Sequence, residues 1–514
     1  MLRKFLICSA AIIYILSMFQ PFLPPATAQQ LPGFEGGISN EMEYMELFVL
    51  TGKPVVLKGE IKVKPGTMRN GKRQDQLNLS LESEDKKIVL KRQLTFEVSM
   101  EQDSDKRQVI EVSRISRFSE NISVKRSDNR TDRYVLDKYE LYSSTVTDMA
   151  PAVDFYSMNV RGKKVYTINR AEGTVTVDIS GSGVGYEHAW GATETRTMDY
   201  VITAQRESTV AGKVYDAGWT GGVQIVESFN RTRDLAYVPN EPAQMSFQGG
   251  YLETVQDEMA ARCSYSLPRF DEDGLPLKGR YTKDEISMTL KTVPTQKRTY
   301  IPKIMDISGH WAQQDIEKLL SLGIMAPSGQ YFGPQTPANR LIFARGVAEL
   351  TDIVSRGKRL DEVRSNLGTS KKKTTSAEPL QFDDVKDSGN DGDYVRYLES
   401  TGVMQGVGPR KFGPEQNLTR AQAVTIIVRA LGLERLAPNP PYSTGFRDDG
   451  DIPGWAKDAV YVAREIGLAR GDSAGFFRPR DIMTKAEAAA FLNRFITYLQ
   501  SDLKKDFRDR IFNY

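Results

Sequence analysis

The stretch Leu418-Thr-Arg-Ala-Gln422 has the composition of a helix start, and it decides how the last third of the chain is organised. Thr419 offers the hydroxyl of an N-cap, and Gln422 stands three residues later as a capping-box partner. Apolar residues then follow at helical spacing. Arg420 is unexpected, because a cation in the first helical turn opposes the helix dipole. It indicates that an anionic group approaches this helix start.

The same helix start returns at two other places, which makes the region from Tyr300 onward a threefold repeat. Each copy has a glycine at a helix end, an aromatic-x-Pro turn, and a basic residue six positions after that proline. The glycines are Gly323, Gly402 and Gly467, the turns are Phe332-Gly-Pro334, Phe412-Gly-Pro414 and Phe477-Arg-Pro479, and the basic residues are Arg340, Arg420 and Lys485. The shared spacing predicts three similar helical units.

These motifs resemble the S-layer homology family, whose repeats run Phe-x-Asp-Val, a His-Trp-Ala-like helix start, Gly-Ile-x-x-Gly, Phe-x-Pro and Ile-Thr-Arg-Ala-Glu. The third copy is most similar, with Trp455-Ala456, Gly467-Leu-Ala-Arg-Gly471 and Met483-Thr-Lys-Ala-Glu487. The second copy has Gly389-Asn-Asp391 in place of His-Trp-Ala. The first copy has Pro327 in place of the second glycine and lacks a capping-box partner. The resemblance covers about two-fifths of the chain.

The resemblance implies a compact helical unit that holds an exported protein noncovalently to the cell wall. Its partner would be an anionic, often pyruvylated, secondary cell-wall polysaccharide or another peptidoglycan-linked polymer. By match of motif, the groove residues would be Arg340, Arg420, Lys485, Trp311, Trp455, Gly323, Gly402, Gly406, Gly467 and Gly471. A ligand carboxylate would meet the basic groups and backbone N–H groups of the helix starts. Glycine would let a sugar approach the main chain closely.

A purely structural role for the three basic residues is the alternative. In that case each of them pairs with an aspartate of a neighbouring copy, Asp306, Asp383 or Asp448, and only holds the three copies together.

The long region 29–297 alternates apolar and polar residues with the two-residue period of β-strands. Val55–Lys64, ended by Pro65-Gly66, is the clearest example, and similar runs follow between charged or glycine-containing turns. The predicted fold class is therefore multidomain, with an all-β, mainly antiparallel N-terminal region and an all-α C-terminal trio of repeats with pseudo-threefold symmetry. The pattern leaves the β topology open.

Motifs for catalysis are hard to find in this β-rich region. The glycines of Ser180–Gly185 fit neither nucleotide fingerprint, and Asp271–Gly274 lacks the later glutamate of a calcium loop. We therefore expect no metal, no cofactor and no catalytic site. His188, Trp190 and Trp219 either form a sugar-stacking platform or are ordinary core and strand-edge aromatics.

The chain start and the composition indicate export. Arg3 and Lys4 precede the apolar run Phe5–Phe19, and Ala26-Thr-Ala28 is a small-x-small cleavage site, although a retained membrane anchor is the alternative. The net charge of +3 over 514 residues gives no basic field for nucleic acid. Two cysteines and two histidines are too few for a zinc or redox site.

Together these patterns predict a secreted, non-enzymatic protein of the cell wall or cell surface. The expected divisions are a signal peptide (1–28), a β-rich region (29–297), repeat 1 (298–355), a linker (356–378), repeat 2 (379–436), repeat 3 (442–500) and a charged tail (501–514). The repeats would anchor the protein, and the β-rich region would have a structural or binding role. Self-assembly on the surface is a further expectation. A wall-anchored polysaccharide-active enzyme is the main alternative. An outer-membrane β-barrel tethered to peptidoglycan is a less favoured one.

Overall fold

The structure is a computed structural model, and it describes residues 36–507 with internal gaps. The gaps are 104–106, 127–129, 211, 240–248, 357–379 and 387–389. The predicted signal peptide and nearly all of the predicted linker therefore lie outside the described residues.

Within its described residues, the β-rich region forms one antiparallel sheet of 15 strands. Neighbours follow chain order from β1 to β10 and then β12, β13 and β14, while β11 pairs with β10 and β15 pairs with β13. The strands are β1 (Gly37–Ser39), β2 (Tyr44–Phe48), β3 (Val55–Lys64), β4 (Lys72–Ser83), β5 (Ile88–Asp103), β6 (Gln108–Lys125), β7 (Thr131–Met149), β8 (Val153–Ile168), β9 (Gly173–His188), β10 (Gly191–Val210), β11 (Lys213–Asp216), β12 (Trp219–Val238), β13 (Gly250–Phe270), β14 (Pro276–Lys291) and β15 (Thr295–Tyr300).

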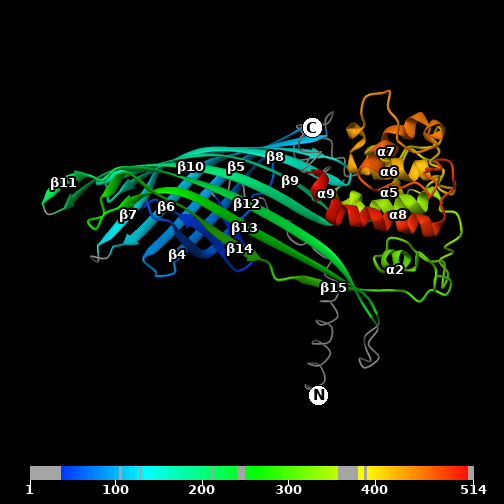
Figure 1. Cartoon of the computed structure of the whole chain (residues 1–514), viewed down its shortest axis with the longest axis horizontal. Helices are drawn as coiled ribbons and strands as arrows, with labels where there is room; N and C mark the ends of the chain where they lie inside the picture. Colours follow the sequence, from blue (N-terminus) through cyan, green and yellow to red (C-terminus); the bar gives the residue numbers. More distant parts are fainter. Residues whose placement is uncertain are drawn as a thin grey trace, which may run out of the picture.

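Alternation along each strand gives the sheet one apolar face. In β4, Leu77, Leu79 and Leu81 are buried, whereas the residues between them are exposed. The sheet curls around this apolar face (Figure 1). Beside β1, Asn40 donates a hydrogen bond to the carbonyl of Lys291 at the end of β14, 2.9 Å away. The sheet is therefore nearly closed, and its apolar side chains form an interior core.

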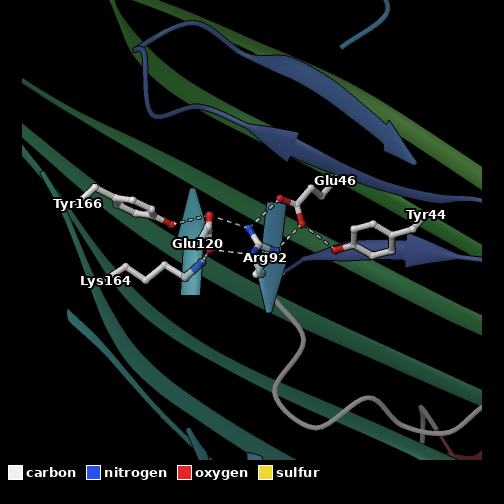
Figure 2. A network of polar contacts seen from close by, with 6 residues as sticks. All are labelled: Tyr44, Glu46, Arg92, Glu120, Lys164 and Tyr166. Carbon is white, nitrogen blue, oxygen red and sulfur yellow. Dashed lines mark hydrogen bonds and ion pairs between the residues drawn. The ribbon is translucent and has the colours of Figure 1, made fainter. Parts of the chain in front are cut away.

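A network of charged side chains crosses this interior (Figure 2). Arg92 on β5 lies 2.8 Å from Glu46 on β2 and 2.7 Å from Glu120 on β6. Lys164 on β8 lies 3.3 Å from Glu120, and the hydroxyl of Tyr166 donates to the same carboxylate at 3.0 Å. Burial raises the pKa of Glu120, but the charges of Arg92 and Lys164 outweigh burial and hold this pKa well below its usual range. A buried ion is costly unless it is paired, so each charge of the network depends on its partners. Because these partners come from different strands, the network joins the first strands of the sheet to its middle.

Where the helical region is described, each repeat has one pair of longer helices. Its elements are α2 (Gln313–Ser321), α3 (Arg340–Thr351), α5 (Asn390–Ser400), α6 (Arg420–Leu431), η1 (Glu434–Leu436), η2 (Asp449–Asp451), α7 (Gly454–Glu465), α8 (Lys485–Thr497), η3 (Tyr498–Asp502) and α9 (Leu503–Asp506). An antiparallel β-rich N-terminal region followed by a helical C-terminal region confirms the predicted fold class. Within the described ranges, no helix is both long and apolar enough to cross a membrane.

The helical region covers one end of the sheet, and the two regions share an apolar core (Figure 1). Trp190, at the turn between β9 and β10, is buried in this core and donates through Nε1 to the carbonyl of Leu350, 2.9 Å away. Phe507, after α9, stacks on Phe155 of β8 with the ring centroids 5.8 Å apart. These contacts fix the orientation of the repeats relative to the sheet.

Candidate functional site

A ring of backbone hydrogen bonds lies where the three repeats meet. The N–H of Ala338 donates to the carbonyl of Met483 at 2.8 Å, that of Met483 donates to Leu418 at 2.9 Å, and that of Leu418 donates to Ala338 at 2.9 Å. Each residue stands just before the second helix of its repeat. The ring therefore brings the three helix starts together around a pseudo-threefold axis.

The helix starts are capped as their sequences predict. Thr419 and Thr484 each form a complete capping box with the residue three positions later. Asn339 caps α3 through a single hydrogen bond from the N–H of Ile342, 2.8 Å away, and no capping box forms there.

The next backbone N–H groups are already occupied by the neighbouring repeat. The N–H of Arg420 donates to the carbonyl of Asp481 at 3.0 Å, and that of Ala421 donates to Pro479 at 3.1 Å. The equivalent groups of the other two helices donate to Gln416, Pro414, Thr336 and Pro334. The expectation that these N–H groups receive a ligand carboxylate is therefore wrong, because backbone carbonyls already satisfy them.

Each of the three basic residues contacts a backbone carbonyl of the next repeat, and repeat 3 contacts repeat 1. Arg340 donates through Nε to Phe412 at 3.1 Å, Arg420 donates through Nε to Phe477 at 2.9 Å, and Lys485 donates through Nζ to Phe332 at 3.3 Å. Both guanidinium groups also lie over the phenylalanine ring that they reach, 5.0 Å and 5.4 Å from its centroid. A cation is tolerated at each helix start because it contacts a carbonyl dipole, and a ring face adds to this at Arg340 and Arg420.

The aspartates cap the aromatic turns of their own repeats. Asp306 accepts from the N–H groups of Phe332 and Gly333 at 2.9 and 2.7 Å. Asp384 and Asp448 accept from the equivalent pairs in repeats 2 and 3. Burial raises the pKa of Asp306, but these backbone hydrogen bonds lower it below its usual range.

Among the described residues, no ion pair joins Arg340, Arg420 or Lys485 to these aspartates, so the suggested pairing is not formed. A different ion pair links repeats 1 and 2, between Arg345 and Asp391 at 2.6 Å. Asp383, which the sequence suggested for repeat 2, pairs instead with Arg410, and Asp384 takes the capping position.

Arg420 borders a cavity of about 240 Å³ that all three repeats line. Trp311 comes from repeat 1 and is 64% exposed, while Arg470 and Arg494 come from repeat 3. Burial lowers the pKa of Arg494, and the charges of Arg470 and Arg420 lower it further. The one carboxylate in the lining, Glu487, already accepts from the N–H of Thr484 at 2.8 Å. We call this set, Trp311, Arg420, Arg470 and Arg494, the arginine groove.

The equivalent positions of the other repeats carry fewer positive charges. Arg494 stands nine residues after the basic residue of its helix, where repeat 1 has Glu349 and repeat 2 has Arg429. Arg429 pairs with Glu434 at 2.9 Å. The position of Arg470 is Ala326 in repeat 1 and Gln405 in repeat 2. The pseudo-threefold arrangement is therefore chemically unequal.

Arg340 and Trp455, the remaining large members of the predicted site, differ in exposure. Arg340 is 6% exposed, and its Nη2 also donates to the carbonyl of Gln405 at 2.7 Å. Its buried side chain therefore links repeat 1 to repeat 2. Burial lowers its pKa below the usual range. Trp455 is 53% exposed at the start of α7.

The predicted glycines have clear backbone roles. Gly323, Gly402 and Gly467 have φ angles of 73°, 75° and 75° at helix ends, a conformation that favours glycine. A Cβ atom on Gly406 would lie 2.6 Å from the ring of Phe382, and one on Gly471 would lie 3.2 Å from the carbonyl of Phe476. Contact of these glycines with a sugar stays a prediction.

Two arginines of the groove were missed by the sequence reasoning. Arg470 stands inside the glycine motif of repeat 3, and Arg494 lies on the second helix of that repeat, so neither belongs to a feature shared by all copies. The available signal was a difference between copies: repeat 3 has a positive charge at both positions, whereas repeat 1 has Ala326 and Glu349 there.

The sugar-stacking platform suggested for His188, Trp190 and Trp219 is not formed. The ladder between β10 and its neighbours places His188 opposite Gly191 and Trp219 opposite Ala204, so the two tryptophans lie near opposite ends of the paired segment. His188 is buried, and burial together with the charge of Arg356 lowers its pKa to about 3. His188 and Trp190 are therefore core residues at the junction with the repeats.

Comparison with known proteins gives a family match in the region of the repeats and several partial relatives. A family model described as S-layer homology domain matches residues 304–341, 381–424 and 445–489. A "Cell surface protein" of Thermoanaerobacter kivui is 35% identical over 121 residues, which is 24% of this chain and 16% of that protein. A "Surface layer protein" of Brevibacillus choshinensis is 34% identical over 104 residues, 20% of this chain and 9% of that protein. An "Endoglucanase" of Bacillus sp. (strain KSM-635) is 30% identical over 132 residues, 26% of this chain and 13% of that protein. The matches thus span less than a fifth of each relative.

Proposed function

We propose, from the premise that residues 304–489 carry three S-layer homology domains, that these domains hold the protein to the cell wall by binding an anionic wall polysaccharide. The family match and the relatives named as surface proteins support a cell-wall or cell-surface location. The observation that carries the proposal is the arginine groove, where three guanidinium groups gather around an exposed tryptophan.

The composition of the groove suits an acidic sugar. Burial lowers the pKa of Arg494, and the like charges of Arg470 and Arg420 lower it further. A bound anion would offset the repulsion among these three groups. Guanidinium groups bind carboxylates through paired hydrogen bonds. The exposed ring of Trp311 offers an apolar face to a sugar ring. A pyruvylated sugar combines these two features, so it is the polymer unit that we favour.

The three predicted sites are unequal in this proposal. The arginine groove is the principal site, whereas Lys485 has neither a tryptophan nor a second arginine at the equivalent positions of its surroundings. Arg340 acts mainly as a joint between repeats, because its side chain is buried against two carbonyls. One strong site per chain is therefore expected.

The β-rich region has a structural or binding role on the surface in this account. An enzyme on the same anchor is the competing proposal, since one of the relatives is named an endoglucanase. Hydrolysis of a glycan needs two carboxyl groups that face each other across an open cleft. Glu46 and Glu120, two buried carboxylates of the sheet, are both paired with Arg92, so we do not assign the two catalytic carboxyl groups to them.

Co-sedimentation of the full chain with purified cell-wall sacculi tests the proposed anchor. We expect the protein to sediment with intact sacculi and to stay in the supernatant after chemical removal of the secondary polymer. Equal sedimentation with both preparations would exclude polysaccharide binding as the anchor.

A further inference from the structure

The end of the sheet that lies away from the helices contains a second, larger cavity of about 1050 Å³. Its lining comes from β9 to β14 and from the turns before β7 and β9. Figure 1 shows that the β11 end of the sheet lies far from the helices. The arginine groove contains none of these residues. The two cavities are therefore separate sites.

Aromatic and cyclic side chains form part of the wall of this cavity. Trp219, at the start of β12, is half-buried, and Tyr281 of β14 is 41% exposed. Pro268 and Pro276 lie in the same lining. A Cβ atom on Gly52 would lie only 3.2 Å from the indole ring of Trp219, so the backbone there packs closely against this ring. The packing fixes the indole in place and makes it a rigid apolar surface.

The polar part of the wall is also held in place. The buried carboxylate of Asp132 accepts from Arg126 at 2.7 and 2.5 Å and from Arg206 at 3.1 Å. The amide of Asn169 donates to the same group at 2.8 Å. Burial raises the pKa of Asp132, but these hydrogen bonds lower it below its usual range. The carboxylate thus joins β7, β10 and two turns, which orders the guanidinium groups of Arg126 and Arg206 before any ligand arrives.

The charges around the cavity nearly cancel. The lining contains the cations Arg126, Arg130, Arg206 and Lys278 and the anions Glu172, Glu207 and Asp216, with Asp132 directly behind two of the arginines. Hydroxyl groups of Thr203, Ser208, Thr209 and Thr220 lie among them. A balanced set of charges gives no net attraction for an anionic polymer, in contrast to the arginine groove.

We propose that this distal cavity binds a neutral oligosaccharide. A sugar needs many hydrogen-bonding partners around its hydroxyl groups and an apolar surface for its C–H face, and the cavity supplies ordered arginines, carboxylates and hydroxyls beside Trp219. A wholly apolar ligand would leave the polar groups unsatisfied, and an acidic one would meet the carboxylates of the lining. The site is independent of wall anchoring by the repeats.

Titration calorimetry of the full chain with three neutral probes, tetra-N-acetylchitotetraose, cellotetraose and maltotetraose, tests this proposal. We expect one probe at least to bind with one site per chain and a dissociation constant below 1 mM, within the usual affinity range of small ligands. Trp219→Ala should weaken that binding at least tenfold. Tyr281→Ala changes an exposed side chain and should weaken it without affecting the fold, which circular dichroism checks. Trp311→Ala, in the arginine groove, serves as the matched tryptophan control and should bind as the wild type does.

Several outcomes would overturn the proposal. It fails if none of the probes binds at 10 mM, or if Trp219→Ala and Tyr281→Ala both bind as the wild type does. It also fails if Trp311→Ala abolishes binding, because the sugar would then occupy the arginine groove. Stronger binding of a neutral tetrapeptide than of any probe would assign the cavity to peptides instead.

Discussion

The buried carboxyl group of Glu227 on β12 predicts a pH-dependent stability. Glu227 is 8% exposed, and its Oε1 has no hydrogen-bond partner among the described residues. Burial raises its pKa to about 7, the charge of Arg196 opposes this rise, and Glu194 adds to it. The folded protein therefore holds a proton on Glu227 that the unfolded chain loses near the ordinary glutamate pKa of 4.5.

The sign and size of the effect follow from this difference. Because the folded state binds the proton more tightly, the stabilisation is complete below pH 4.5 and is lost as the pH rises through about 7. A difference between 4.5 and about 7, at about 1.4 kcal/mol per unit, corresponds to about 3 kcal/mol. Glu227→Gln cannot ionise, so it should be more stable than the wild type at pH 8 by up to about 3 kcal/mol and nearly equal to it at pH 4.5.

Urea unfolding followed by far-ultraviolet circular dichroism at several pH values measures this difference. Glu207→Gln, which changes an exposed glutamate of β10, is the matched control and should leave the pH dependence unchanged. The reasoning is refuted if Glu227→Gln keeps the pH dependence of the wild type, or if it lowers the free energy of unfolding at pH 8.

Three further changes test the core, the junction and the helix ends. Arg92→Met leaves Glu46 and Glu120 buried without their main partner and should cost about 3 to 5 kcal/mol in urea unfolding, so a cost below 1 kcal/mol would contradict the role of the network. Phe507→Ala removes the ring that stacks on Phe155 and should separate unfolding of the repeats from that of the sheet in calorimetry, whereas a single unchanged transition would argue against the shared core. Gly467→Ala places a Cβ at φ 75° and should lower the free energy of unfolding by about 1 to 2 kcal/mol, measured against Gly454→Ala, where a Cβ meets open space.

Local spacing made much of the fold predictable. The two-residue period and the shared spacing of the repeats depend on neighbours in sequence, so the β-rich region, the helical region and the caps at Thr419 and Thr484 could be inferred. Contacts between distant residues could not. Trp190 meets Leu350, and Phe507 meets Phe155, because the repeats pack on one end of the sheet, and no local pattern indicates that packing.

The candidate site was predictable only in part for the same reason. Arg420 and Trp311 belong to motifs that recur, so comparison of the copies found them. Arg470 and Arg494 occur in one copy and become neighbours of Arg420 only through the cyclic arrangement of the repeats. That arrangement also explains why the helix-start N–H groups are unavailable to a ligand, since each donates a hydrogen bond to a carbonyl of the next copy.

Affinity for purified wall polysaccharide tests the central claim most directly. Arg470 is exposed, so Arg470→Ala should leave folding unchanged and still remove one guanidinium group from the arginine groove. A charged hydrogen bond contributes about 1.5 to 3 kcal/mol, so binding should weaken by about 10- to 100-fold. Arg410→Ala, an exposed arginine of repeat 2 outside the groove, should bind as the wild type does. Equal affinity of Arg470→Ala, Arg410→Ala and the wild type would contradict the assignment of wall binding to the arginine groove.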